Sequence, residues 1–132
     1  MTDAIGLVRQ FFDSWREGAG AVNRSFYDHF TPETVWDNVG LARTTGPHEA
    51  VAFLRRGEEL RQRDAIRVEL LSVAQDGNKI LTERIDYLLG KDGEVQNVIP
   101  VMGILEIADE KITAWREYFD ITPFRPPAGS TA

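Results

Sequence analysis

The 132-residue sequence contains no cysteine, which excludes disulfide bonds, thiolate metal ligands and a cysteine nucleophile. Basic residues are also scarce: 15 lysines and arginines face 21 aspartates and glutamates, and the net charge is −6. A nucleic-acid partner would need a basic face, so none is expected. No apolar run is long enough to span a membrane, and residues 1–5 lack the pattern of a signal peptide. We therefore expect a cytoplasmic protein without a membrane partner.

Histidine is nearly absent as well, and the two histidines, His29 and His48, lie outside any catalytic motif. No Gly-x-Ser-x-Gly sequence occurs, so a Ser–His–Asp mechanism is not expected. The histidine spacing is not that of a metal-binding HExxH motif, and no glycine-rich phosphate loop follows a predicted strand. We therefore predict neither a metal nor a cofactor. If the protein is an enzyme, carboxylates are the natural acid and base.

What the sequence does contain is the pattern of one α+β domain over residues 1–132. Apolar residues at helical spacing predict helices at 5–15, 21–30 and from Gly46-Pro47 into the charged stretch 55–63. Runs bounded by turn residues predict strands at 34–39, 67–74, 79–89, 94–107 and 112–121. A bend or bulge is expected at Pro100 and Gly103, and an irregular tail from about residue 125.

Helices that come first, followed by consecutive strands, favour helices gathered on one face of a curved mixed or antiparallel sheet. Such a sheet wraps around a pocket that the N-terminal helices close, and a pocket of this kind is a natural ligand site. Side chains alternate between the two faces of a strand. The polar side chains that alternate toward the pocket are therefore the candidate functional residues.

The strand at residues 79–89 carries the first candidates. Alternation puts Arg84 and Asp86 on one face, between Thr82 and Leu88. The simpler interpretation is that the opposite face is the core and that Arg84 and Asp86 form an exposed ion pair, which is worth little energetically. Taken alone, this strand favours the simpler interpretation.

The last predicted strand changes that balance. Alternation places Glu117 between Trp115 and Phe119 and sends Asp120 to the other face. The two aromatic side chains would exclude water from the carboxylate and raise its pKa, as acid–base catalysis requires. The alternatives are an edge strand with a mixed exposed face, or aromatic residues at a subunit interface.

A third segment contains Trp36 and Asn38, which share one face of the strand at 34–39. An indole N–H and a carboxamide could together position a water molecule. Alone, the pair is better explained by a core tryptophan and an asparagine in a turn.

Together these segments resemble the limonene-1,2-epoxide hydrolase family, within the nuclear-transport-factor-2-like superfamily. The resemblance is carried by Thr82-Glu83-Arg84-Ile85-Asp86 and by Lys111-Ile112-Thr113-Ala114-Trp115-Arg116-Glu117-Tyr118-Phe119-Asp120. It extends from the first helix to Phe124. The Arg-x-Asp sequence with the downstream Trp-Arg-acid-Tyr-Phe-Asp is its specific part, whereas Trp-x-Asn alone is weak.

The resemblance implies a cone-shaped, cystatin-like α+β barrel that hydrolyses an epoxide to a vicinal diol in one step, without a covalent intermediate. By position, Asp86 is the general acid that protonates the epoxide oxygen. Glu117 is the general base that takes a proton from the attacking water, and Asn38 with Trp36 helps to place that water. Arg84 lies between the two carboxyl groups and holds them in different protonation states.

The sequence differs from the family pattern at two of these positions. The family has Asp where this chain has Glu117, and Tyr where it has Trp36. Glutamate is one methylene longer than aspartate, so the base reaches differently. An indole donates a hydrogen bond but, unlike a phenol, accepts none.

The substrate implied is a small lipophilic epoxide. Six apolar residues are expected to line its pocket: Leu88, Ile99, Val101, Trp115, Phe119 and Phe124. The charged third helix suits a terpene poorly, so the substrate need not be limonene oxide. A homodimer is expected through the outer face of the sheet, which carries Ile85, Tyr87 and Tyr118.

Two other functions remain open. Ketosteroid isomerases and polyketide cyclases of the same superfamily also use a carboxylate in a cone-shaped pocket, although an arginine beside the acid suits a two-carboxyl proton relay better. A non-catalytic protein that binds small molecules is the other alternative, because fold alone does not fix function. That alternative predicts that Arg84 and Glu117 are exposed or far apart.

Overall fold

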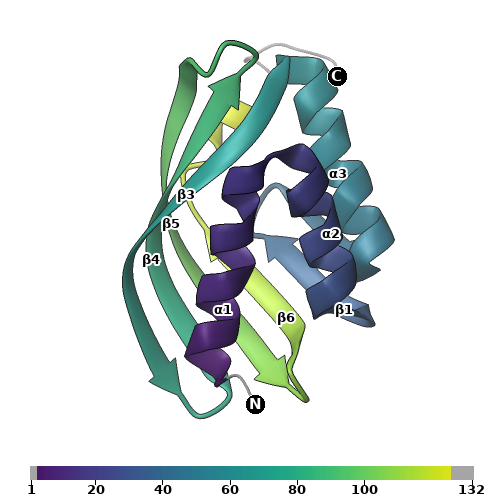
Figure 1. Cartoon of the computed structure of the whole chain (residues 1–132), viewed down its shortest axis with the longest axis vertical. Coiled ribbons are helices and arrows are strands. Elements are labelled where there is room, and N and C mark those ends of the chain that lie inside the picture. Colours follow the sequence, from purple (N-terminus) through teal and green to yellow (C-terminus); the bar gives the residue numbers. More distant parts are fainter. Residues whose placement is uncertain (1–2, 126–132) are drawn as a thin grey trace.

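The computed structural model describes residues 3–125, in which three α-helices lie on the same side of a curved sheet (Figure 1). The helical elements are α1 (Ala4–Asp13), the 3-10 turn η1 (Ser14–Glu17), α2 (Ala19–His29), α3 (Gly46–Arg61) and the 3-10 turn η2 (Thr122–Phe124). The strands are β1 (Phe30–Asn38), β2 (Ala42–Thr45), β3 (Arg63–Asp76), β4 (Lys79–Gly90), β5 (Val95–Ala108) and β6 (Lys111–Tyr118). The predicted irregular tail falls on residues 126–132, outside the described part of the chain.

The six strands form one mixed sheet in the order β2-β1-β6-β5-β4-β3. Strands β1 and β6 are parallel, and the other neighbours are antiparallel. The α+β class with helices over one face of a curved sheet is as predicted. The curved sheet is open, because β2 and β3 form its two edges. Helix α3 packs against β1, β2 and β3 and so covers the gap between those edges.

The helix ends follow from the sequence. The Asp3 side chain caps α1 by accepting a hydrogen bond of 2.5 Å from the backbone N–H of Gly6. Pro47 lies in the first turn of α3, where the missing N–H has no intrahelical partner to lose. Helix α2 ends at His29, and β1 begins at Phe30, because Pro32 keeps the preceding residue out of the helical conformation.

Two details of the sheet differ from the prediction. Strand β2 was not expected, because four residues are too few for the alternation of a strand to be recognised. The expected bulge at Pro100 and Gly103 is wrong: Pro100 pairs with Ile85 in the regular register, and the shifts in β5 lie elsewhere. Pairing between β5 and β6 starts only at Met102, so Pro100 lies where β5 has no partner in β6 and a residue without an N–H is tolerated.

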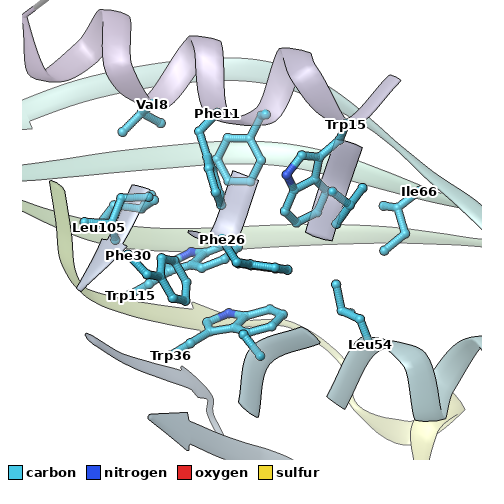
Figure 2. Packing of buried hydrophobic residues seen from close by; sticks show 14 of the residues in the cluster. Val8, Phe11, Trp15, Phe26, Phe30, Trp36, Leu54, Ile66, Leu105 and Trp115 are labelled. Atoms are coloured by element: carbon cyan, nitrogen blue, oxygen red, sulfur yellow. The ribbon is translucent and has the colours of Figure 1, made fainter. Parts of the chain in front are cut away.

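An aromatic cluster fills the space between the helices and the sheet (Figure 2). Phe11 packs at its centre, with ring centroids 5.4 Å from Trp15 and 5.5 Å from Trp115. Trp36 stacks flat on Trp115, with centroids 4.7 Å apart and planes at 9°. The polar candidate residues of β1, β4 and β6 pack against this cluster.

None of the helices within residues 3–125 has the length and apolarity needed to cross a membrane.

Candidate active site

The inner face of β4 is the one that carries Arg84 and Asp86, which alternation had put on the same face. Ile80, Thr82, Arg84 and Leu88 are buried, and the Asp86 side chain is 15% exposed. The simpler interpretation, an exposed ion pair with the core on the opposite face, is therefore wrong for this strand. Burial of an arginine is costly unless its charge is paired and its N–H groups are bonded, so its partners decide what the site can do.

Arg84 has a carboxyl group on two sides. Its Nε donates to Oδ1 of Asp86 at 2.9 Å, and its Nη2 donates to Oδ2 at 3.1 Å, which is a bidentate contact. Nη2 also forms an ion pair with Oε2 of Glu117. The guanidinium carbon lies 4.6 Å from the centre of the Phe12 ring and 5.6 Å from that of Trp115, within the range of cation–π attraction.

Glu117 is brought to Arg84 by the pairing of three strands. Gly103 of β5 pairs with Thr82 of β4 on one side and with Glu117 of β6 on the other. A β-carbon on Gly103 would lie 3.2 Å from Nη1 of Arg84 and 3.4 Å from Oε2 of Glu117. Glycine at this position therefore leaves the space in which the arginine and the glutamate meet.

The parallel pairing of β1 with β6 adds the remaining two candidates. Asn38 lies beside Glu117 in the register, and Trp36 lies beside Trp115. The indole N–H of Trp36 donates to Oε1 of Glu117 at 3.3 Å. Nδ2 of Asn38 is buried without a hydrogen-bond partner among the described residues, although Asn38 lines a cavity. The structure thus brings together all five residues that the sequence singled out as catalytic candidates.

The electrostatics of the site follow from burial and from the shared arginine. Burial raises the pKa of Glu117 to about 7; Arg84 acts against this rise, and the charge of Asp86 adds to it. Burial alone would lower the pKa of Arg84, but the charges of Asp86 and Glu117 outweigh it and raise this pKa above its ordinary value. Arg84 therefore stays charged, whereas Glu117 can gain or lose a proton near neutral pH.

These groups stand on the wall of a cavity of about 340 Å³. Five of the six expected pocket residues line it: Leu88, Ile99, Val101, Phe119 and Phe124. Trp115 does not. It is fully buried, because Trp36 stacks on one side of it and the aromatic rings of α1 cover another.

The histidines take no part in this site. His29 is half-buried against the ring of Phe11, with centroids 5.6 Å apart, and burial lowers its pKa. His48 is exposed on α3. Within residues 3–125, no group of three histidine, aspartate or glutamate side chains is arranged to hold a metal ion.

Comparison with known proteins gives the family of the chain. The sequence profile of the limonene-1,2-epoxide hydrolase catalytic domain matches residues 2–124. The chain belongs to this family. Among curated proteins it is similar to the epoxide hydrolase EphG of Mycobacterium tuberculosis (strain ATCC 25618 / H37Rv), with 35% identity over 89 residues. That alignment covers 67% of this chain and 56% of EphG, so the chain spans little more than half the length of this relative.

Two solved structures have a fold similar to that of this chain. An LEH-like epoxide hydrolase from M. tuberculosis superposes with a TM-score of 0.69 at 28% identity, covering 89% of this chain and 83% of the other. An NTF2-like protein of unknown function from Cytophaga hutchinsonii ATCC 33406 gives a TM-score of 0.69 at 13% identity, covering 94% and 96%. The second likeness concerns the fold alone.

The two departures from the family pattern of limonene-1,2-epoxide hydrolases are in contact with each other. Trp36 and Glu117 share the hydrogen bond from Nε1 to Oε1 described above. The two positions at which the resemblance predicts other residues, Asp for Glu117 and Tyr for Trp36, therefore lie in direct contact. Arg84 and Glu117 are buried and in contact, which is the opposite of what the hypothesis of a non-catalytic binding protein predicts.

Sequence reasoning missed one wall of the cavity. Side chains of α3 and of the start of β3 line it, including Phe53, Leu54, Arg61, Arg63 and Ile66. The apolar stripe of α3 and its density of arginines were visible in the sequence. What the sequence did not contain was a signal that this helix crosses the open side of the sheet.

Proposed function

We propose that this chain is an epoxide hydrolase that opens a small lipophilic epoxide to a vicinal diol in one step. The observation that carries the proposal is a single buried arginine, Arg84, bound to two carboxyl groups on the wall of a cavity. Membership of the limonene-1,2-epoxide hydrolase family and the similarity to EphG support epoxide hydrolysis in general. The mechanism below is argued from the residues of this chain.

In the proposed reaction, Glu117 is the base and Asp86 the acid. A water molecule held by Asn38 and Glu117 attacks one epoxide carbon and gives a proton to Glu117. The ring C–O bond breaks, and Asp86 gives its proton to the leaving oxygen, so that one diol forms. Burial raises the pKa of Glu117 and so makes it a stronger base than an ordinary carboxylate, as general base catalysis favours. Asn38 suits the placement of water because its buried Nδ2 lacks a protein partner among residues 3–125.

Arg84 makes this proton exchange possible inside a buried site. Before the reaction Asp86 is neutral and Glu117 is charged, and afterwards the reverse holds. Arg84 carries one positive charge in both states, so the three groups sum to zero throughout. No net charge is created away from water, where it would be costly. The proton returns from Glu117 to Asp86 between two groups that the same guanidinium binds.

The reaction requires no cofactor, because ring strain, a positioned water molecule and proton donation together supply the driving force and the catalysis. An isomerase or cyclase of the same superfamily would need one carboxylate and no water among the reactants. The arrangement of a second carboxyl group and an unpartnered amide N–H beside it favours hydrolysis over that alternative.

The direct test is incubation with cyclic and aryl epoxides in water labelled with heavy oxygen. We expect a vicinal diol that contains one labelled oxygen, and a loss of roughly 10²- to 10⁴-fold in kcat/KM for Asp86→Asn. Asp37→Asn is a matched control, because Asp37 lies on β1 outside the cavity and pairs with Arg43. Product without label would favour the isomerase or cyclase, and full activity in Asp86→Asn would overturn the assigned acid.

We also propose that two copies pair through the outer face of the sheet. Val98, Met102 and Tyr118 are 52%, 52% and 47% exposed, and Met102 pairs with Tyr118 across β5 and β6. An exposed apolar patch of this kind on a sheet can meet a copy of itself across a two-fold axis. Analytical ultracentrifugation should find a dimer that Met102→Glu converts to a monomer. Tyr27→Glu, on α2, should leave the dimer intact; a monomeric wild type contradicts the proposal.

A further inference from the structure

Three arginines besides Arg84 line the cavity. Arg56 and Arg61 belong to α3, and Arg63 is the first residue of β3. Arg63 pairs with Gly90 of β4, six residues beyond Arg84, which is about 20 Å along the strand at a rise of about 3.3 Å per residue. Within residues 3–125, none of these three arginines forms an ion pair with a carboxylate.

Arg63 is the buried member of this group, at 8% exposure. Its Nη2 donates to the backbone oxygen of Leu54 at 3.2 Å, whereas its Nε is buried without a hydrogen-bond partner in the described chain. Glu58 attracts it from a distance beyond ion-pair contact. Burial lowers the pKa of Arg63 and Glu58 raises it, with burial the larger effect. A buried cation with a free donor is the arrangement that an anionic ligand completes.

The chain also makes room for this guanidinium. Gly57 lies inside α3, where glycine is less favourable than alanine. A β-carbon there would lie 2.9 Å from Nη2 and 3.3 Å from Nη1 of Arg63. The glycine therefore keeps the arginine in the cavity wall, as part of a site formed by α3 and β3 together.

Between the two polar ends the cavity wall is apolar. Leu88 lies two residues beyond Asp86 on the inner face of β4, its neighbour Ile66 on β3 is also buried, and both line the cavity together with Ile99. A ligand that reaches from Asp86 to Arg63 must therefore present hydrocarbon in its middle section.

We propose that the substrate is the epoxide of an apolar carboxylic acid, with the epoxide against Asp86 and the carboxylate on Arg63. The planar fork of an arginine matches a carboxylate through two parallel hydrogen bonds, and Arg56 and Arg61, which also line the cavity, add positive charge to it. The reaction in this inference rests on the proposed function, whereas the recognition of the acid does not depend on it.

Binding without chemistry tests the recognition directly. The intact chain is titrated with decanoate and with decanol, and the affinities are compared by calorimetry. We expect decanoate to bind roughly tenfold more tightly or better, as a charge-assisted hydrogen bond allows. The preference should vanish in Arg63→Met. Arg55→Met is the matched control, because Arg55 lies on the exposed side of α3 outside the cavity and should keep the preference.

Catalysis is compared with the terminal epoxides of undecenoic acid and of undecenol. A higher kcat/KM for the acid that Arg63→Met removes supports the proposal. Equal binding of decanoate and decanol to the wild type overturns it, while diol formation from both epoxides would leave the hydrolase standing. Selective binding of decanoate with no diol from either epoxide would instead remove the proposed function. If Arg63→Met does not fold, Gly57→Ala should weaken the preference by displacing the guanidinium, and an unchanged preference would contradict the site.

Discussion

Arg84 binds Asp86 through two N–H groups and reaches Glu117 through one of the same two nitrogens. The two carboxyl groups therefore share a cation, and the protonation of one depends on that of the other. Because β4, β5 and β6 hold these residues in adjacent register, the relationship is fixed by strand pairing and not by a flexible loop. Several measurable properties depend on this sharing of Arg84 by the two carboxyl groups.

The first is the dependence of activity on pH. The proposed cycle needs one proton shared by Asp86 and Glu117. Because the charge of Asp86 contributes to the pKa of about 7 at Glu117, this value marks the loss of that shared proton. We therefore expect kcat/KM for epoxide hydrolysis to fall as pH rises through about 7, since no proton is then left for the epoxide oxygen. Glu117→Gln should be nearly inactive over the range from about pH 5 to about pH 9. An activity that is independent of pH across this range would remove Glu117 as the base.

Stability should depend on the same proton. The pKa of Glu117 is about 7 in the folded chain, against an ordinary value of 4.5, so the folded state holds the proton more tightly than the unfolded state. The resulting stabilisation is fully present below the unfolded value and is lost as pH rises through about 7, a loss on the order of 3 kcal/mol.

A neutral replacement isolates this effect from the other titrating groups. Glu117→Gln should melt close to the wild type at about pH 5 and at a higher temperature than the wild type at about pH 8. Thermal unfolding followed by circular dichroism at both pH values gives the comparison. A constant difference in melting temperature would show that the Glu117 proton does not contribute.

The sequence was most informative about features that depend only on the residue pattern within a single strand. Alternation along residues 79–89 put Arg84 and Asp86 on one face, although that strand alone favoured an exposed ion pair. The aromatic neighbours of Glu117 indicated a desolvated acid with a raised pKa. Both expectations follow from the alternation of side chains along a strand, which can be recognised within a short stretch of sequence. The family resemblance then supplied the pairing of the two segments, which neither strand records alone.

Features that depend on contacts between segments far apart in the sequence were harder to predict. Trp115 was expected in the pocket because its side chain points to the inner face of the sheet. That face borders both the cavity and the aromatic core, and the stacked ring of Trp36 places Trp115 in the core. Arg63 could not be assigned to the cavity, since its position depends on α3 crossing the open edge of the sheet. The hydrogen bond from Trp36 to Glu117 likewise depends on the parallel register of β1 and β6.

Gly103 provides a test of how tightly the shared arginine is packed. A β-carbon at this position would approach Nη1 of Arg84 and Oγ1 of Thr82 to 3.2 Å each. We expect Gly103→Ala to cost about 1–3 kcal/mol of stability, as overpacking in a core does, and to reduce kcat/KM by displacing the arginine. Gly20→Ala on α2 is the control, since its β-carbon would meet only Arg24 at an ordinary 3.5 Å. Unchanged stability and activity in Gly103→Ala would mean that the site is looser than its distances indicate.

The last prediction concerns Trp36 and Glu117, the two residues that differ from the family pattern. The indole nitrogen of a tryptophan lies closer to its own backbone than the phenol oxygen of a tyrosine does. A short donor therefore meets a long acid here, at 3.3 Å. The pattern expected from the family resemblance, Tyr with Asp, combines a long donor with a short acid. Each single change, Trp36→Tyr or Glu117→Asp, should misplace the carboxylate and reduce kcat/KM, by up to about 10²-fold for a displacement near 1 Å.

The double variant Trp36→Tyr with Glu117→Asp restores the family combination and should recover much of the lost activity. The cycle of four proteins then yields a coupling free energy of about 0.5–3 kcal/mol in the favourable direction. Melting temperatures of all four proteins separate recovery of the site from recovery of the fold. Losses that simply add would show that the two positions act independently, and that the hydrogen bond between them does not set the position of the base.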